Sequence, residues 1–279
     1  MKLTPKALEI DAAATTEHIK RFIRDAVEKT GAKGVVLGLS GGIDSSTVAA
    51  LSALALGGEK VQALILPEEE TYNETDIEHA RRVAKKFQLK TTEIDITPVI
   101  KAYYDTLPIF DPTHKTSRGN IKARARMIYI YYYANKQNLL VCGSSDKSET
   151  MMGYFTKWGD VAADIAPLMD LYKTQVRQVA KHVGVPDEII LKPPTPALWR
   201  GQLAEQELGI KYEVLDLILF GLEHFMTTEE IAAQLKINHQ TVENVKKRWL
   251  SMEHKRRMPL SLKLGYRTVG KDFRLSHQL

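Results

Sequence analysis

Residues 38–46 have the sequence GLSGGIDSS, a short run rich in glycine and serine. They follow the β-branched run GVVLGL at 34–39 and precede a segment of helical character at about 45–56. A glycine-rich turn between a buried strand and a helix is typical of an open α/β sheet, whose ligands bind at the carboxyl ends of the strands. The stretch therefore predicts both a parallel sheet and the place of a binding site.

The same turn has the chemistry of a phosphate site. Gly41 and Gly42 leave backbone N–H groups uncovered, the serines add hydroxyl donors, and the helix N-terminus adds its positive dipole end. Phosphate would repel Asp44 unless a cation stood between them, which indicates Mg²⁺. The simpler alternative is a glycine-rich turn with Asp44 as a helix N-cap. The pattern G-x-x-x-x-G-K-[ST] is absent, so the chain is not a Walker-type ATPase.

Strands and helices alternate through the first half of the chain. Further strands are predicted at 61–66, 91–96 and 139–142, with helices before Gly31, at 74–87 and at 121–134. Short connections between them favour a doubly wound parallel sheet with helices on both faces. The simplest organisation is one domain over 1–279 with a helical extension at its C-terminus.

Composition excludes several classes of protein. The chain has 279 residues, of which 44% are hydrophobic and 26% charged, as in ordinary globular proteins. No apolar run approaches the roughly 18 residues that span a bilayer, and the polar start predicts no signal peptide. Cys142 is the single cysteine, so intrachain disulfides and a cysteine-based zinc site are excluded. We expect a cytoplasmic enzyme.

The C-terminal part is basic. Residues 246–279 hold ten Lys/Arg and two acidic residues, a local charge of +8 in a chain whose net charge is +5. Residues 227–250 are typical of a helix-turn-helix, within a helical basic segment at 226–260. A nucleotide-sensing DNA-binding protein is therefore an alternative function, although the second helix offers few residues that read bases, and we expect no nucleic-acid partner.

The proline-rich stretch LKPPTPALWRGQL at 191–203 fits no regular element. A long irregular segment inside a compact domain is often an active-site lid. We predict a lid over 191–210; the alternative is a packed surface crossover.

Longer motifs carry a family resemblance. SGGIDSS resembles the pyrophosphate loop of the N-type ATP pyrophosphatases, which adenylate their substrates. Four further stretches, GNIKARARM at 119–127, GSSDKSETMMGYFTKWGDVAADIAPL at 143–168, LYKTQVRQVAKHVGVP at 171–186 and MEHKRRMP at 252–259, are similar to the ammonia-dependent NAD synthetases, as is the proline-rich stretch. The resemblance runs from about 15 to 260.

The resemblance implies an activity. It implies an adenine nucleotide alpha hydrolase-like fold and ATP-dependent amidation of deamido-NAD with ammonia, with Mg²⁺ as cofactor and a homodimer as the assembly. The products are NAD, AMP and pyrophosphate, formed through a deamido-NAD adenylate. Another adenylating enzyme of the SGGxDS group remains an alternative.

The resemblance also implies roles for individual residues. Asp44 and Lys173 would be catalytic, and Asp44 and Glu149 would bind the metal. ATP would contact Gly38, Leu39, Ser40, Gly41, Gly42, Ile43, Asp44, Ser45, Ser144, Lys173 and Thr195. Deamido-NAD would contact Arg124, Lys157, Asp164, His254 and Lys255.

Two places depart from the family pattern. Pro196 and Ala197 replace an Ala-Gly or Ala-Asp pair after Thr195, and the aspartate usual near Leu203 and Ala204 is missing. The departures concern the predicted lid and leave the ATP loop and the metal pair intact.

Overall fold

The computed structural model describes residues 2–269 and 272. Four strands form one sheet in the order β3-β2-β1-β4, and every neighbouring pair is parallel. They are β1 (Val35–Gly38), β2 (Val61–Ile65), β3 (Lys90–Glu93) and β4 (Leu140–Val141). The predicted parallel sheet is confirmed. The rest of the predicted basic tail, at 270–271 and 273–279, lies outside the described residues.

The strand order explains where ligands can bind. The chain builds β1, β2 and β3 in one direction and then returns to the other side of β1 to form β4. The helices that connect these strands, α2 (Ile43–Leu56) between β1 and β2 and α5 (Lys115–Gln137) between β3 and β4, therefore lie on opposite faces of the sheet. The carboxyl ends of β1 and β4 form the crevice at the topological switch point.

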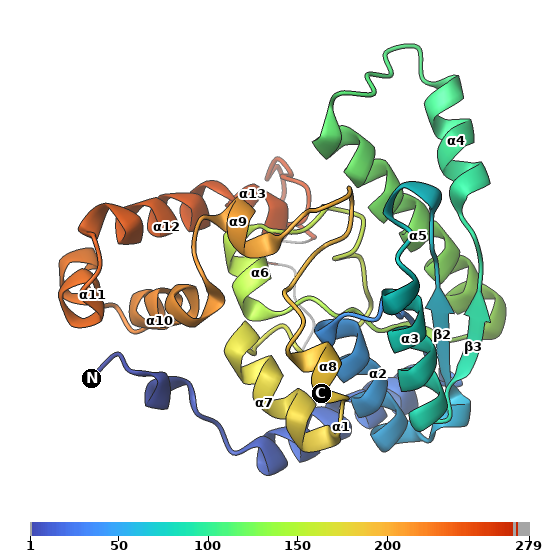
Figure 1. The fold of residues 1–279 in the computed structure, drawn as a ribbon, viewed down its shortest axis with the longest axis horizontal. Coiled ribbons are helices and arrows are strands. Elements are labelled where there is room, and N and C mark those ends of the chain that lie inside the picture. Colours follow the sequence, from blue (N-terminus) through green and yellow to red (C-terminus); the bar gives the residue numbers. More distant parts are fainter. Residues whose placement is uncertain (1, 270–271, 273–279) are drawn as a thin grey trace.

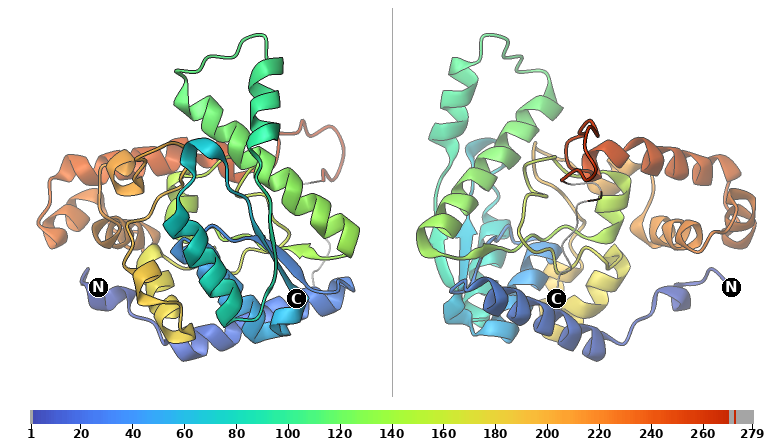
Figure 2. Two further views of the ribbon diagram at one scale, coloured as in Figure 1. Left: turned by 45° about the vertical axis from the view of Figure 1, so that its right-hand side comes forward. Right: turned by 180° about the vertical axis from the view of Figure 1, so that it is seen from behind.

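Two helical layers cover the sheet, as the sequence predicts (Figures 1 and 2). Along β1, Val35 and Leu37 enter one core and Val36 enters the other, because side chains of a strand alternate between faces. The first core is closed by α1 (Ala12–Thr30), α2 (Ile43–Leu56), α3 (Glu74–Lys86), α7 (Lys173–Val183) and α8 (Asp187–Ile190). The second is closed by α4 (Thr97–Thr106) and α5 (Lys115–Gln137).

Two predicted elements differ in length from the observed ones. The strand predicted at 91–96 ends at Glu93, because Asp95 turns to accept a 2.8 Å hydrogen bond from the Thr97 N–H and leads the chain into α4. The helix predicted at 121–134 extends to Lys115–Gln137. His114 caps its start and Asn138, at φ +56°, ends it, so polar caps set bounds that apolar spacing does not mark.

Cys142 lies in the first core, just after β4. Its thiol is 3.8 Å from the Ser52 hydroxyl, and burial raises the pKa of Cys142 to about 12. The thiol is therefore protonated at neutral pH.

A third core lies beside the sheet and consists of helices (Figure 1). It joins the N-terminal turn η1 (Pro5–Leu8) to α6 (Lys147–Met152), α9 (Ala204–Leu208), α10 (Tyr212–Glu223), α11 (Thr228–Leu235) and α12 (His239–Ser251); α13 (Glu253–Arg256) follows. The short turns η2 (Gly58–Lys60) and η3 (Glu69–Thr71) complete the described elements. None of the helices in the described ranges is long and apolar enough to cross a membrane.

The helix pair predicted at 227–250 is confirmed as α11 and α12. Val242 and Val245 of α12 are buried in the third core. At the start of α12, His239 lies 3.4 Å from the Glu229 carboxylate and 3.6 Å from that of Glu243. A recognition helix would present this first turn to DNA, and acidic side chains there disfavour contact with phosphates.

Candidate active site

The loop 38–46 joins β1 to α2 at the switch point. Gly41 adopts φ +77°, and a Cβ there would lie 2.0 Å from the Asp76 carbonyl oxygen, so only glycine fits. The Ser40 and Ser45 hydroxyls are 3.0 Å apart, and the Ser45 Oγ accepts a hydrogen bond from the Ser40 N–H. These contacts hold the loop closed around the N-terminus of α2, where backbone N–H groups favour an anion.

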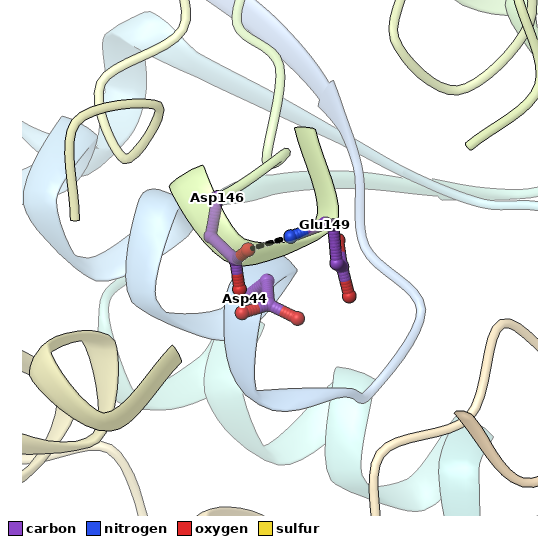
Figure 3. A group of neighbouring side chains, drawn as sticks. All are labelled: Asp44, Asp146 and Glu149. Carbon is purple, nitrogen blue, oxygen red and sulfur yellow. Dashed lines mark hydrogen bonds between the residues drawn. The ribbon is translucent and has the colours of Figure 1, made fainter. Parts of the chain in front are cut away.

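Three carboxylates meet beside this loop (Figure 3). Asp44 belongs to the first turn of α2, whereas Asp146 and Glu149 come from the start of α6. Oxygen atoms of all three lie within 4.8 Å of one another. Asp146 caps α6 by accepting a 2.8 Å hydrogen bond from the Glu149 N–H, which fixes the two side chains relative to each other.

The ammonium of Lys173 lies among these carboxylates. Its Nζ is 2.6 Å from Asp44 Oδ2, 2.8 Å from Asp146 Oδ2 and 2.9 Å from Glu149 Oε1, and the side chain is fully buried. Burial alone would lower the pKa of Lys173, but attraction to the three carboxylates raises it well above its ordinary value. Lys173 is therefore a fixed positive charge at the first residue of α7.

Burial also acts on the carboxylates. It raises the pKa of Asp146 and raises that of Glu149 well above the ordinary range, against the opposing attraction of Lys173. The single Lys173 ammonium thus contacts three carboxyl groups in a site with little access to water. Asp44 Oδ1 is buried and has no hydrogen-bond partner in the described part of the chain. Hard oxygen donors with spare negative charge suit a divalent cation such as Mg²⁺, so the donor set fits the predicted metal.

A cavity of about 660 Å³ opens from this point along the ends of the strands. Several predicted ATP-binding residues line it, as do the predicted metal ligands and one predicted deamido-NAD residue: Gly38, Leu39, Ser40, Gly42, Ile43, Asp44, Ser45, Ser144, Glu149, Thr195 and Lys255. Gly41 turns away toward α3, and Lys173 is buried behind Asp44 and Glu149. The structure thus gathers the predicted ATP residues other than Gly41 and Lys173 around one cavity.

The other predicted deamido-NAD residues lie outside the lining. Arg124 on α5 donates a 3.1 Å hydrogen bond to the Lys157 carbonyl, and the Lys157 ammonium donates a 2.6 Å bond to the carbonyl of His254. The three form one chain of contacts on the surface. Asp164 lies apart from this chain. Its carboxylate accepts a 2.7 Å hydrogen bond from the Val141 N–H, which ties it to β4.

Comparison with known proteins places these features in a family. The model of the NAD synthase family matches residues 15–259. The chain belongs to the NAD synthase family. It is 50% identical over 245 residues to the NH(3)-dependent NAD(+) synthetase of Methanocaldococcus jannaschii, covering 86% of this chain and 93% of that protein. The family resemblance inferred from the motifs is confirmed.

Solved structures agree with the fold. NMN synthetase from Francisella tularensis has a TM-score of 0.82 and 32% identity over 92% of this chain and all of that one. NH3-dependent NAD synthetase from Campylobacter jejuni has a TM-score of 0.76 and 30% identity over 91% of this chain and all of that one. The predicted doubly wound fold is confirmed.

The proline-rich segment forms one wall of the cavity in this family member. It has no helix or strand from Leu191 to Leu203, and Thr195, Pro196 and Ala197 are among its lining residues. The Lys192 ammonium is paired with the Asp76 carboxylate at the start of α3. The segment is therefore attached to the first turn of α3, which Gly41 also approaches. Its movement as a lid stays a prediction.

A buried ion cluster fastens the same wall to α5. Lys122, fully buried, donates 2.7 Å bonds to Glu68 and Glu70 and a 3.1 Å bond to the Leu198 carbonyl. Arg200 Nε donates a 2.9 Å bond to the Glu70 carbonyl. Three distant segments thus converge on one ammonium.

Sequence reasoning missed Asp146 and Lys122. Asp146 is three residues before Glu149, the spacing of an N-cap to its helix, and this signal within SSDKSE could have revealed it. Lys122 stands inside the quoted GNIKARARM motif, but its partners at 68, 70 and 198 are far away in the sequence. No local pattern indicates such a contact.

Proposed function

We propose that this chain amidates deamido-NAD with ammonia at the expense of ATP, giving NAD, AMP and pyrophosphate. The observation that carries the proposal is the SGGIDS loop at the switch point, with Asp44, Glu149 and Lys173 gathered beside it. The family membership and the name of the Methanocaldococcus jannaschii relative support it.

The reaction consists of two substitution steps in the same active site. A carboxylate oxygen of deamido-NAD attacks the α-phosphorus of ATP, and the bond to the bridging oxygen of pyrophosphate breaks. Ammonia then attacks the acyl carbon of the adenylate, AMP leaves, and one proton is released. In both steps the negative charge shifts onto phosphate oxygens, so fixed positive groups lower the barrier.

The chain's own residues supply these groups. The N–H groups of the loop around Gly42 and the N-terminus of α2 would hold the phosphates. Lys173, from its place behind Asp44 and Glu149, would act on these phosphates as a fixed positive charge. Asp44 and Glu149 would hold Mg²⁺, which supplies charge neutralisation between phosphate oxygens. Asp146, with its two oxygens used by the Glu149 N–H and by Lys173, would serve as the permanent counter-ion of the lysine.

Deamido-NAD would extend from the cavity over the connected surface residues Arg124, Lys157 and His254, with Lys255 at the cavity rim. These cationic or polar groups suit its pyrophosphate and nicotinate carboxylate. The Lys255 ammonium donates a 2.5 Å hydrogen bond to the Gly153 carbonyl, which places it at the turn after α6. Asp164 would contact a ribose hydroxyl or the pyridinium ring, since a carboxylate cannot bind an anion.

We further propose a homodimer that acts in the cytoplasm. On α5 the side chains of Ile128 and Tyr132 are 51% and 66% exposed, and they follow Arg124, a proposed deamido-NAD residue, on the same helix. An apolar helix face in this position suits a second copy of the chain. Light scattering after size exclusion should give twice the chain mass of 31.4 kDa.

The decisive experiment measures pyrophosphate, AMP and NAD together. The pure chain with ATP, Mg²⁺, deamido-NAD and ammonium should form the three products in equal amounts. Omission of deamido-NAD should suppress pyrophosphate release, and glutamine should not replace ammonium, because Cys142 is buried and no other cysteine could serve as the nucleophile of a glutaminase. Pyrophosphate release that is indifferent to deamido-NAD would refute the proposal.

A second acceptor is favoured by one observation. The structure with the TM-score of 0.82 is an NMN synthetase, whose name indicates a mononucleotide product. Nicotinate mononucleotide lacks the adenylate half of deamido-NAD and would need fewer of the surface contacts. Comparison of kcat/KM for the two acceptors decides between them, and we expect deamido-NAD to be preferred.

A further inference from the structure

One face of α10 lies directly behind the site. Tyr212 and Asp216 are four residues apart and therefore share a face of the helix, and both side chains are fully buried. They belong to the C-terminal helical region, whose core is separate from the two cores of the sheet. This face is the place where that region meets the residues around Lys173.

Asp216 fixes the starts of two helices at once. Its Oδ1 accepts a 2.6 Å hydrogen bond from the Ser148 hydroxyl, and its Oδ2 accepts a 2.8 Å bond from the Thr174 N–H. The Ser148 Oγ in turn accepts a 2.9 Å bond from the Lys173 N–H. The first N–H groups of a helix have no partner inside the helix, so a carboxylate from α10 supplies what the first turn of α7 lacks.

The same contacts help to position the side chains of Glu149 and Lys173. Ser148 precedes Glu149 on α6, and Lys173 is the first residue of α7. A single buried carboxylate therefore bonds to both of the helices that carry Glu149 and Lys173. Displacement of either by about 1 Å would separate charges now 2.9 Å apart.

Tyr212 acts on the side chain of the same lysine. The Lys173 ammonium lies 5.3 Å from the centre of the Tyr212 ring, within the range of a cation–π contact. Asp216 thus holds the backbone of Lys173 and Tyr212 covers its ammonium. Both contacts come from one helix face.

We propose that Asp216 of α10 is a positioning residue for the proposed reaction, which keeps Lys173 and Glu149 in register with the ATP loop. The proposal rests on the proposed function. It gives the C-terminal helices a part in catalysis without placing any of their side chains on the reacting atoms.

The test compares Asp216→Asn with Gln178→Leu. An asparagine replaces one carboxylate oxygen with an NH2 group, which donates and does not accept, so it cannot accept from both Ser148 and Thr174 as the carboxylate does. Gln178 lies on α7 as well, where its side chain donates to the Leu8 carbonyl and accepts from the Ile10 N–H. Its replacement removes two hydrogen bonds that join the middle of α7 to the N-terminal segment, and serves as the structural control.

Two measurements are made at a temperature well below the melting point of each variant. Asp216→Asn should lower kcat/KM for ATP about 10–100-fold, as loss of groups that orient a site typically does. It should weaken the binding of α,β-methylene ATP in the presence of Mg²⁺, measured by calorimetry, by a similar factor. Gln178→Leu should lower the melting temperature and leave both quantities within about twofold of the wild type.

The possible outcomes test the positioning role of Asp216 separately from the proposed function. Wild-type binding and wild-type kcat/KM in folded Asp216→Asn would overturn the positioning role. If the wild type binds the ATP analogue but forms no NAD, the proposed function fails while the binding comparison still tests Asp216. Should Asp216→Asn not fold, Ser148→Ala removes the bond from the Lys173 N–H and the bond to Asp216 but keeps the bond between Asp216 and the Thr174 N–H. This variant should weaken analogue binding about 3–10-fold, and unchanged binding overturns the proposal.

Discussion

Removal of the Lys173 ammonium is the sharpest test of the charge cluster. Lys173→Met keeps the length of the side chain and leaves three carboxylates without their shared cation. Loss of one partner from a buried ion pair typically costs about 3–5 kcal/mol of unfolding free energy, because the remaining charge stays buried and uncompensated. In a chain of this size that corresponds to a fall in melting temperature of roughly 6–20 °C, at about 2–4 °C per kcal/mol.

Magnesium should restore part of this loss. If Asp44 and Glu149 bind the cation, Mg²⁺ can occupy the place that the ammonium leaves. At about 100 times its dissociation constant a ligand adds about 2.7 kcal/mol of stability. Thermal unfolding followed by circular dichroism, with and without 10 mM Mg²⁺, should show a larger rise for Lys173→Met than for the wild type.

Lys147→Met is the matched control. Lys147 is paired with Asp170 and Glu223, and the Asp170 side chain is 98% exposed. Ion pairs at the surface contribute about 0–1 kcal/mol, so this variant should melt within a few degrees of the wild type and ignore Mg²⁺. The reasoning is refuted if the two substitutions cost the same, or if Mg²⁺ stabilises Lys173→Met no more than the wild type.

Four further predictions follow from single side chains. Asp44→Asn should reduce turnover at least 100-fold with little change in melting temperature, and near-normal activity at limiting Mg²⁺ would contradict the metal assignment. Lys255→Ala should raise KM for deamido-NAD and leave KM for ATP unchanged, an effect that shrinks with salt. Gly41→Ala should abolish ATP binding in an equilibrium assay, because its Cβ would collide with the Asp76 carbonyl and φ +77° costs about 1–2 kcal/mol more. Burial raises the pKa of Asp216 from 3.8 to about 6, so between these pH values the folded state keeps a proton that the unfolded chain releases. The free energy of unfolding should therefore fall by about 3 kcal/mol as the pH rises from about 4 to 6. Urea titrations of Asp216→Asn should lack that fall.

Local sequence pattern predicted the parts of this molecule that are locally determined. The loop 38–46 indicated its strand, its helix and its place at the sheet edge, because glycines and a β-branched run act within a few residues of one another. The alternation at 91–96 predicted the edge strand β3 but placed its end at 96, three residues beyond the observed Glu93. The end of β3 at Glu93 depends on the turn in which the Asp95 carboxylate accepts a hydrogen bond from the Thr97 N–H.

The site was predicted only as far as motifs mark it. Asp44, Glu149 and Lys173 come from three quoted motifs, and the structure brings them within hydrogen-bond distance. Asp216 lies in no quoted motif and contributes through contacts 42 and 68 residues away along the chain. Long-range burial of this kind depends on how helices pack, which composition and periodicity do not specify.

The buried position of Cys142 makes the chain convenient for labelling. With its pKa near 12, the thiol is almost wholly protonated at pH 7.5 and is sealed within the first core, so maleimides should not modify the native protein. A cysteine introduced at Leu191, whose side chain is 81% exposed at the start of the proline-rich segment, would then be the one reactive thiol. A dye or spin label at this position would report on the mobility and the surroundings of that segment, with ATP or without it, on a background that needs no cysteine removed.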